Sequence, residues 1–158
     1  MEFRQLLEAR HSVRRFTDQP IERCVIDEMV EEAGLAPSSK NSKSSGFMII
    51  EDKSTLEAIS EMREHGSGLI KGAAAAIVVL GNTEATDLWL DNAAISATYL
   101  LLSAVNKGLG ACWVHVNGRP RVKTDPSQGT AEGYLRELLG IKDNMKPLCV
   151  IALGYEDK

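Results

Sequence analysis

The chain has 158 residues, of which 44% are hydrophobic and 25% are charged, and its formal net charge is −4. This length fits one domain over residues 1–158, the composition is too apolar for a disordered chain, and the charge argues against a broad nucleic-acid surface. The three cysteines form no C-x-x-C pair, which favours reduced thiols in the cytoplasm over a disulfide framework or a zinc site. The N-terminus lacks the apolar core of a signal peptide, and no apolar run reaches the ~20 residues of a membrane span.

Helical and extended patterns alternate along the chain. Five stretches carry apolar residues at helical spacing, and four short apolar runs between glycine, proline or polar residues favour strands. Ser54 and Glu57 have the spacing of a capping box at the start of the third helix. The expected helices cover residues 2–9, 21–33, 54–63, 86–107 and 131–140, and the expected strands cover 47–51, 75–81, 111–116 and 147–155.

The fourth expected helix is the longest. Its sequence AAISATYLLLSAV is apolar almost all round, which predicts a long, buried, central helix. Four short strands with such a helix fit an α+β or α/β sandwich, and no segment marks a domain boundary.

The segment RHSVRRF, Arg10 to Phe16, concentrates positive charge after the first helix. If it is extended, alternation places Arg10, Ser12 and Arg14 on one face, where two guanidinium groups and a hydroxyl suit a phosphate or a ribityl chain. If it is helical, Arg10 and Arg14 still share a face. A solvated cationic turn at a helix C-terminus explains the same residues at least as well.

The loop APSSKNSKSSG, residues 36–46, supplies hydroxyls, an amide and free backbone N–H groups. These groups can hydrogen-bond a polar planar ligand, although an ordinary surface loop has the same composition.

The stretch GLGACWVHVNG, residues 108–118, joins two glycines, a strand and a closing Asn117-Gly118. Bare backbone at such a strand end can approach a flat ring closely, and a helix C-cap that leads into a core strand is an equally good explanation.

Other chemistries find little support. The chain has neither G-x-G-x-x-G nor G-x-x-x-x-G-K-[ST], and its three histidines lack metal-ligand spacing. Cys112 lies within an apolar strand and is better explained as a core residue than as a nucleophile. We therefore name no catalytic residue and no metal ligand.

Taken in this order, the three segments resemble the FMN-dependent nitroreductase family. That family has an R-x-S-x-R-x-F-like motif, then A-P-S-S-x-N-x-Q-P-W, then a long apolar helix that ends in G-L-G before a strand, and a last strand that ends in glycine. The matching residues are Arg10, Ser12, Arg14 and Phe16, then Ala36, Pro37, Ser38, Ser39 and Asn41, then residues 108–116, and finally CVIALGY at residues 149–155.

The resemblance implies an α+β fold, a nitroreductase-like α/β sandwich with a central, mainly antiparallel sheet flanked by helices. It implies a homodimer with shared FMN sites, and a ping-pong reaction in which NAD(P)H reduces FMN and leaves before a nitroaromatic, a quinone or a similar small acceptor takes the electrons. Arg14 is the candidate for stabilising the reduced ring at its N1–O2 edge. The implied cofactor-binding residues are Arg10, His11, Ser12 and Arg14, then Pro37, Ser38, Ser39 and Asn41 from the other subunit, and His115, Val116, Asn117 and Gly118 near the flavin N5.

The chain also departs from the family pattern. Lys43, Ser44 and Ser45 replace Q-P-W, which weakens the expectation of a ring-edge contact and of a stiff loop. The sequence ends at Lys158, where many members continue with a basic segment that contacts the FMN phosphate, so Arg10, Arg14 and a lysine such as Lys158 are expected to hold it. The short connection between the second strand and the long helix predicts a more open active site.

Two functions fit this sequence. One is an FMN-dependent oxidoreductase, and the other is a non-catalytic flavin-binding or sensing module of the same fold.

Overall fold

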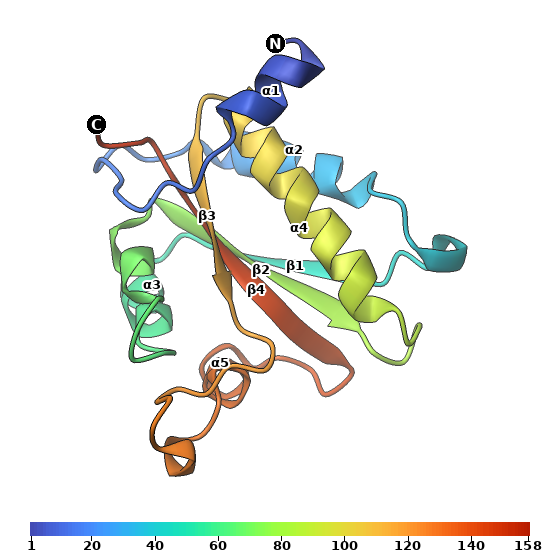
Figure 1. The fold of residues 1–158 in the computed structure, drawn as a ribbon, viewed down its shortest axis with the longest axis vertical. Coiled ribbons are helices and arrows are strands. Elements are labelled where there is room, and N and C mark those ends of the chain that lie inside the picture. The colour runs from blue at the N-terminus through green and yellow to red at the C-terminus, as the bar shows by residue number, and fades with distance from the viewer.

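An antiparallel four-stranded sheet forms the centre of the computed structural model, which describes residues 1–158 (Figure 1). The strands lie in the order β1-β2-β4-β3, and each neighbouring pair is antiparallel. They are β1 (Ser45–Ile50), β2 (Ala75–Asn82), β3 (Gly110–His115) and β4 (Met145–Gly154). The helices are α1 (Phe3–Ala9), α2 (Arg23–Gly34), α3 (Lys53–Ser60), α4 (Trp89–Asn106) and α5 (Ala131–Leu139), with short 3-10 segments η1 (Ser39–Asn41), η2 (Gly68–Gly72) and η3 (Pro126–Gln128).

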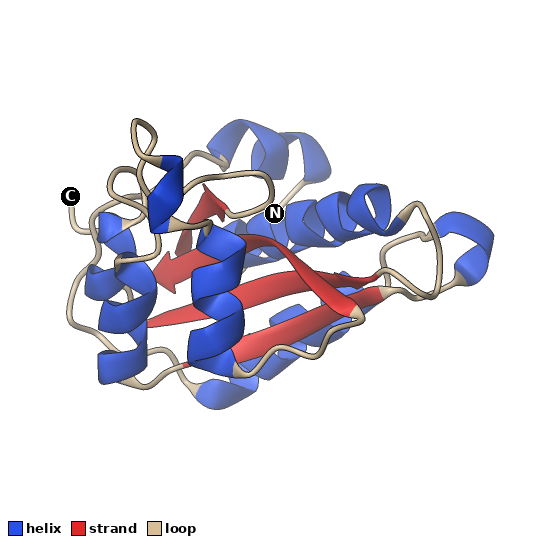
Figure 2. Cartoon of the chain, turned by 90° about the horizontal axis from the view of Figure 1, so that it is seen from below, coloured by secondary structure: helices blue, strands red, loops and turns tan.

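Helices cover both faces of the sheet (Figure 2). α2 and α4 pack on one face in a core that includes Ile77 and Ile151. α3 and α5 pack on the other face, where Val78 and Val150 lie. Because successive side chains of a strand point to opposite faces, the two central strands need apolar residues at nearly every position. This requirement explains why β2 and β4 have continuous apolar sequences.

The long helix α4 buries only one of its faces within this chain. Its small residues Ala93, Ala97 and Ala104 lie in the core, which lets the helix approach the sheet closely. On the opposite face, Ile95 and Tyr99 are each 37% exposed. The expected central helix is therefore present, but part of its second apolar face is exposed.

The α+β class is confirmed, and the nine expected helices and strands form in the expected order. The expected capping box is wrong. Asp52 caps α3 and accepts the Thr55 N–H at 3.0 Å, while the Ser54 hydroxyl donates to the same carboxylate at 2.6 Å. An ionised carboxylate accepts a stronger hydrogen bond than a hydroxyl, so Asp52 takes the cap position. None of the helices combines the length and hydrophobicity that a bilayer crossing requires.

Candidate functional site

The arginine-rich segment lies beside the first residues of β3. Ser12 pairs with Ala111 in a parallel bridge, and the Val13 N–H donates to the Ala111 carbonyl at 2.9 Å. Further along, the Thr17 N–H donates to the Tyr155 carbonyl at 2.8 Å. The segment is therefore extended, which is the first of the two conformations considered from the sequence.

Two glycines allow this close approach. A Cβ on Gly110 would lie 2.8 Å from the Val13 side chain, and a Cβ on Gly154 would lie 2.7 Å from the Phe16 ring. Gly108 turns the chain out of α4 with a φ of 76°. At this end of β3 the glycines therefore serve the helix C-cap and the packing of the segment, rather than the approach of a ligand.

Within the segment, the side chain of Val13 is buried, whereas those of its neighbours Ser12 and Arg14 are exposed. Arg10 and Arg14 are exposed, and neither forms an ion pair with a carboxylate. Ser12 and Arg14 lie close to Cys112. Burial raises the pKa of the Cys112 thiol, and the charge of Arg14 and a hydrogen bond from Ser12 oppose that shift. A buried thiol with a raised pKa suits a core cysteine and not a nucleophile.

His11 is held within the chain. Its Nδ1 lies 2.9 Å from the Ala9 carbonyl oxygen, and its Nε2 lies 3.1 Å from the Glu156 carboxylate. Both hydrogen bonds raise the pKa of His11, and the one to Ala9 contributes more. The neighbouring Arg15 carbonyl accepts the Asp157 N–H at 3.0 Å. His11 and Arg15 thus fasten the C-terminal residues to the segment.

A buried asparagine on α4 organises the loop of residues 36–46. The Asn92 amide donates to the hydroxyls of Ser39 and Ser44 at 3.1 and 3.0 Å, and its carbonyl oxygen accepts the Ser39 N–H at 3.0 Å. The Ser38 hydroxyl accepts the Lys43 N–H at 3.0 Å. Ser44 and Lys43, which replace residues of the family motif, therefore help to hold the loop in one conformation.

This loop carries backbone strain. Lys40, Asn41 and Lys43 have φ angles of 51°, 52° and 50°, in a region that non-glycine residues rarely adopt. Pro37 and Asn41 are exposed, whereas the hydroxyls of Ser38 and Ser39 are engaged in holding the loop. Such over-determined, strained loops are typical of ligand contacts.

The loop and the arginine-rich segment lie at opposite ends of α4 (Figure 1). Asn92, which holds the loop, is in the first turn of α4, and Gly110, which packs on Val13, follows its last turn. The helix has 18 residues, so its ends are about 27 Å apart at 1.5 Å per residue. Hence the two groups of expected cofactor ligands do not form one site within a single chain.

The end of β3 has an unused backbone donor at Gly118. The N–H groups of Val116 and Asn117 both donate to the Leu148 carbonyl at 3.0 Å, and the Val116 side chain is buried. Gly118 is exposed, has a φ of 72°, and its N–H has no partner. Gly118 therefore has a free backbone N–H at this strand end, unlike Val116 and Asn117.

An aromatic pair lies on the α4 side of the same strand. The rings of Trp113 and His115 are stacked, with centroids 6.2 Å apart and an interplanar angle of 14°. The Trp113 Nε1–H donates to His115 Nδ1 at 3.1 Å, which fixes the tautomer with the proton on Nε2. Burial, and then the charges of Arg119 and Arg63, lower the pKa of His115. The lowered pKa favours the neutral imidazole.

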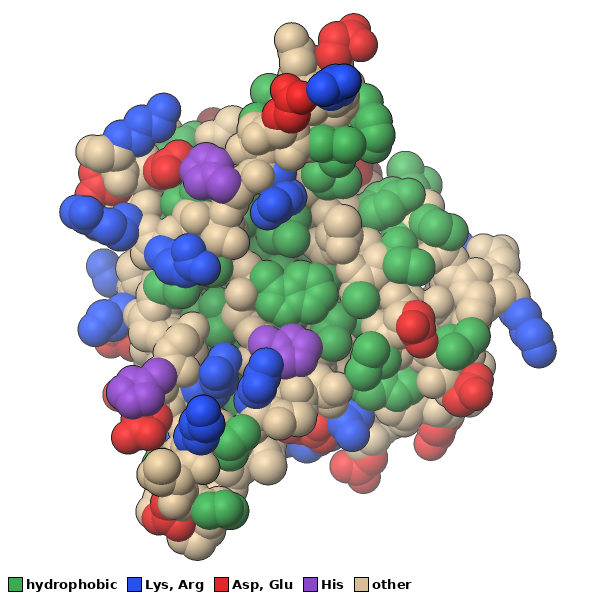
Figure 3. All heavy atoms as spheres, viewed as in Figure 1, with side chains coloured by type: hydrophobic (Ala, Val, Ile, Leu, Met, Phe, Trp, Pro, Cys, Tyr) green, Lys and Arg blue, Asp and Glu red, His purple; other side chains and the backbone are tan.

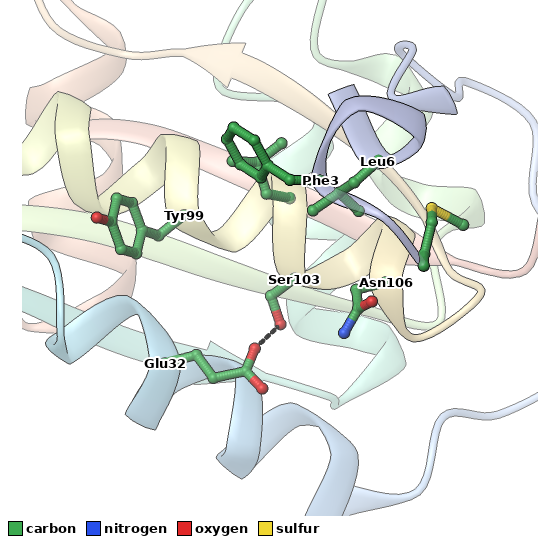
Figure 4. Close-up of a pocket in the computed structure, with 8 residues that line it drawn as sticks. Phe3, Leu6, Glu32, Tyr99, Ser103 and Asn106 are labelled. Carbon is green, nitrogen blue, oxygen red and sulfur yellow. Dashed lines mark hydrogen bonds between the residues drawn. The ribbon is translucent and has the colours of Figure 1, made fainter. Parts of the chain in front are cut away.

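A hollow of about 470 Å³ opens between α1, α2 and α4 (Figure 4). Phe3, Leu6 and Tyr99 line it, and Glu32 and Ser103 are hydrogen-bonded at its floor. No residue of α1 is buried. The hollow is continuous with the exposed apolar face of α4 and contains none of the expected cofactor ligands.

Comparisons with known proteins agree with this fold and these motifs. The sequence model of the nitroreductase family matches residues 7–65 and 61–155. The chain belongs to the nitroreductase family.

Individual members of this family are similar over nearly the whole chain. A protein of Archaeoglobus fulgidus, provisionally named NADH dehydrogenase/NAD(P)H nitroreductase, is 31% identical over 156 residues, which are 96% of this chain and 83% of that protein. A protein of the same provisional name from Methanothermobacter thermautotrophicus is 28% identical over 158 residues, which are 98% of this chain and 78% of that protein. The structure of an FMN-dependent nitroreductase from Clostridium difficile R20291 has a TM-score of 0.91 and 34% identity, and covers 97% of this chain and 87% of that chain.

Membership of the nitroreductase family confirms the resemblance drawn from the sequence motifs and supports an oxidoreductase. Within the chain, Arg10, Ser12 and Arg14 lie at the start of β3, and His115 to Gly118 lie at its end. Six strand residues span about 20 Å, so both groups border one surface along β3.

A cluster of cations that the sequence motifs do not predict lies beside His115. Arg63, Arg119, Arg121 and Lys123 line one hollow, and on the face drawn in Figure 3 Lys and Arg side chains gather next to a central hydrophobic surface. Three of these residues come from NGRPRVK, the polar loop after β3. The cations on either side of Pro120 in this loop were a sequence signal for such a cluster. Arg63 is far from them in sequence and comes close to them only in the folded chain.

Proposed function

We propose that this chain is an FMN-dependent oxidoreductase of the cytoplasm that folds as one FMN-binding domain over residues 1–158. In this proposal electrons pass from NAD(P)H to a nitroaromatic, a quinone or a similar small acceptor in a ping-pong sequence. FMN, when bound, supplies the redox chemistry, and the protein supplies binding, orientation and electrostatics. The similarity to the FMN-dependent Clostridium difficile protein supports the choice of cofactor.

The observation that carries the proposal is the placement of the arginine-rich segment against β3. The guanidinium groups of Arg10 and Arg14 have no carboxylate partners, and the Ser12 hydroxyl lies between them in sequence on an extended backbone. Unpaired guanidinium forks bind phosphate oxygens in pairs, so this group fits the phosphate end of FMN. Arg14 is also the candidate cation for stabilising negative charge at the N1–O2 edge of the ring.

The far end of β3 fits the ring end of the cofactor. The free N–H of Gly118 can donate a hydrogen bond near the flavin N5, and a glycine with a positive φ presents backbone without a side chain in the way. The lowered pKa of His115 favours its neutral form, and the proton then lies on Nε2 because Nδ1 accepts from Trp113. We assign no acid or base to the protein, since hydride and electron transfer are the chemistry of the cofactor.

A homodimer completes this site in our proposal. The loop that carries Pro37, Ser38, Ser39 and Asn41 lies at the opposite end of α4 from Arg10, so both groups can contact one FMN only if a second copy supplies the loop. The exposed apolar face of α4, with Ile95 and Tyr99, fits the interface between two copies. Sedimentation should show a dimer, and a stable monomer that retains FMN would contradict the shared site.

Purification tests the activity directly. The protein should be yellow, lose its colour with NADPH and regain it when a nitroaromatic or a quinone is added. A yellow protein that NAD(P)H does not bleach would instead support the second candidate, a non-catalytic flavin-binding or sensing module. A colourless protein that takes up no FMN would exclude both.

A further inference from the structure

A basic hollow lies beside the end of β3, outside the residues assigned to FMN. Its volume is about 290 Å³, and no hydrophobic residue lines it. The walls come from two segments far apart in sequence, one with Arg63 and Glu64 after α3 and one with Arg119, Arg121 and Lys123 after β3. We call this group of residues the basic hollow.

The cations of the basic hollow have no carboxylate partners. None of the ion pairs in the chain includes Arg63, Arg119, Arg121 or Lys123. The one carboxylate in the lining, Glu64, lies 3.9 Å from His65. Burial, and then the charge of Arg119, lower the pKa of Arg63, so these two guanidinium groups repel each other. Although the protein has a net charge of −4, the unpaired cations of the hollow create a local positive potential that attracts anions.

The wall of the hollow is built rather than loosely arranged. The guanidinium of Arg121 lies 4.2 Å from the centroid of the Tyr134 ring and donates to the Glu61 carbonyl at 3.0 Å. The Arg121 carbonyl in turn accepts the Glu64 N–H at 2.8 Å, which ties the two segments together. The Nε of Arg121 is buried and has no partner. Buried polar groups in folded proteins nearly always have a hydrogen-bond partner, such as the protein, a water molecule or a ligand.

The hollow is connected to the end of β3 that faces the proposed cofactor. Arg63 Nη1 donates to the His115 carbonyl at 3.4 Å, so its guanidinium links the basic hollow to the end of β3. Arg119 follows Gly118 directly, is exposed, and its side chain forms no ion pair. It is therefore free to reach an anion that lies between the hollow and the surface along β3.

We propose that the basic hollow is a subsite for an anionic group, phosphate or carboxylate, of the substrate that exchanges electrons at the end of β3. This inference rests on the proposed function and narrows its substrate class. The anion belongs either to NAD(P)H, through its pyrophosphate or 2′-phosphate, or to an acceptor that carries a carboxylate. In both cases the guanidinium groups would anchor one end of the substrate and leave the reacting end beside Gly118.

The first test measures binding without turnover. Inorganic pyrophosphate should bind the purified protein saturated with FMN, so that Arg10 and Arg14 are not available to it, and Arg119→Gln should weaken that binding about 10-fold, the scale of one charge-assisted hydrogen bond. Lys71→Gln is the matched control. Lys71 is an exposed, unpaired lysine on η2, so this substitution removes one positive charge outside the basic hollow. Pyrophosphate binding that is equal in both variants would overturn the proposal, whether or not the FMN-loaded protein transfers electrons.

The second test identifies the source of the anion from the KM values of Arg119→Gln. A rise of about 10-fold for NADPH alone assigns the 2′-phosphate, and a rise for NADPH and NADH together assigns the pyrophosphate. A rise for 4-nitrobenzoate, with none for the neutral 4-nitrobenzyl alcohol, assigns an acceptor carboxylate. KM values that all match those of Lys71→Gln would overturn the role in substrate binding. A wild-type protein that holds FMN but transfers no electrons would count against the proposed function instead.

Discussion

Two groups of basic side chains border β3, and they are built in different ways. The arginine-rich segment is continuous in sequence, and its Arg10 and Arg14 stand exposed on an extended backbone at the start of the strand. The basic hollow joins residues from two segments at the end of the strand, and Arg63 and Arg121 in it are half-buried. The side chains of Arg10 and Arg14 in the first group are free of partners, whereas Arg63 and Arg121 of the second group are held by hydrogen bonds to backbone carbonyls.

The histidine in each region responds oppositely to its surroundings. Hydrogen bonds to Ala9 and Glu156 raise the pKa of His11. Burial and two nearby arginines lower the pKa of His115. The pKa of His11 is thus set mainly by the Ala9 carbonyl and then by Glu156, whereas the pKa of His115 is set mainly by burial and then by Arg119 and Arg63.

The largest expected effect concerns FMN binding by the arginine-rich segment. Arg10→Ala should weaken FMN binding by about 1.5–3 kcal/mol, because it removes a charge-assisted hydrogen bond to the phosphate. Arg15→Ala is the matched control, since alternation turns Arg15 away from Arg10 and Arg14. Equilibrium dialysis measures both affinities. Equal retention of FMN by Arg10→Ala and the wild type would show that this segment is not the phosphate site.

The next effect concerns the wall of the basic hollow. Tyr134 donates its hydroxyl to the Ala58 carbonyl at 2.7 Å and supports Arg121 with its ring. Tyr134→Phe removes only the hydrogen bond and should cost about 0.5–1.5 kcal/mol of stability. Tyr134→Leu also removes the cation–π contact and should cost about 0.5–1 kcal/mol more. Urea unfolding measures both, and equal losses would mean that the contact with Arg121 contributes nothing.

A smaller effect concerns the pKa of His115, which NMR titration of its ring protons should place below its ordinary 6.5. Arg119→Gln should raise it part of the way back, because burial, the larger cause, remains. Since the folded state disfavours the charged ring, this histidine lowers stability as the pH falls below 6.5, and has no effect above it. A pKa of His115 at or above 6.5 would contradict the uncompensated positive charge near the hollow.

The smallest effect concerns His11, whose pKa should lie above 6.5 in the same titration. Glu156→Gln should lower it without returning it fully, because the Ala9 carbonyl is the larger cause. The stabilisation from this contact is present in full below 6.5 and is lost as the pH rises through the pKa of the folded state. If Glu156→Gln left the pKa of His11 unchanged, the contact that fastens the C-terminal residues would be absent in solution.

Much of the fold follows from local sequence patterns. The apolar periods locate every helix and strand, because a helix or strand must present its apolar residues to a core. The start of α3 was misplaced, since Asp52 competes with Ser54 for the same cap and the charged acceptor forms the stronger bonds. The role of Asn92 was also missed, because its bonds to residues 39–44 join positions about 50 apart in sequence.

By itself, the sequence determined the elements, the family motifs and the arginines of RHSVRRF, since each depends on residues that are neighbours in the chain. Only the tertiary structure decided that this segment is extended, because bonds to Ala111 and Tyr155 select that conformation from two that the local pattern allows. It also decided that the two groups of expected cofactor ligands lie at opposite ends of α4, and it brought Arg63 close to Arg119. These properties arise from contacts between distant residues, whose geometry exists only once the sheet and its two helical layers have packed.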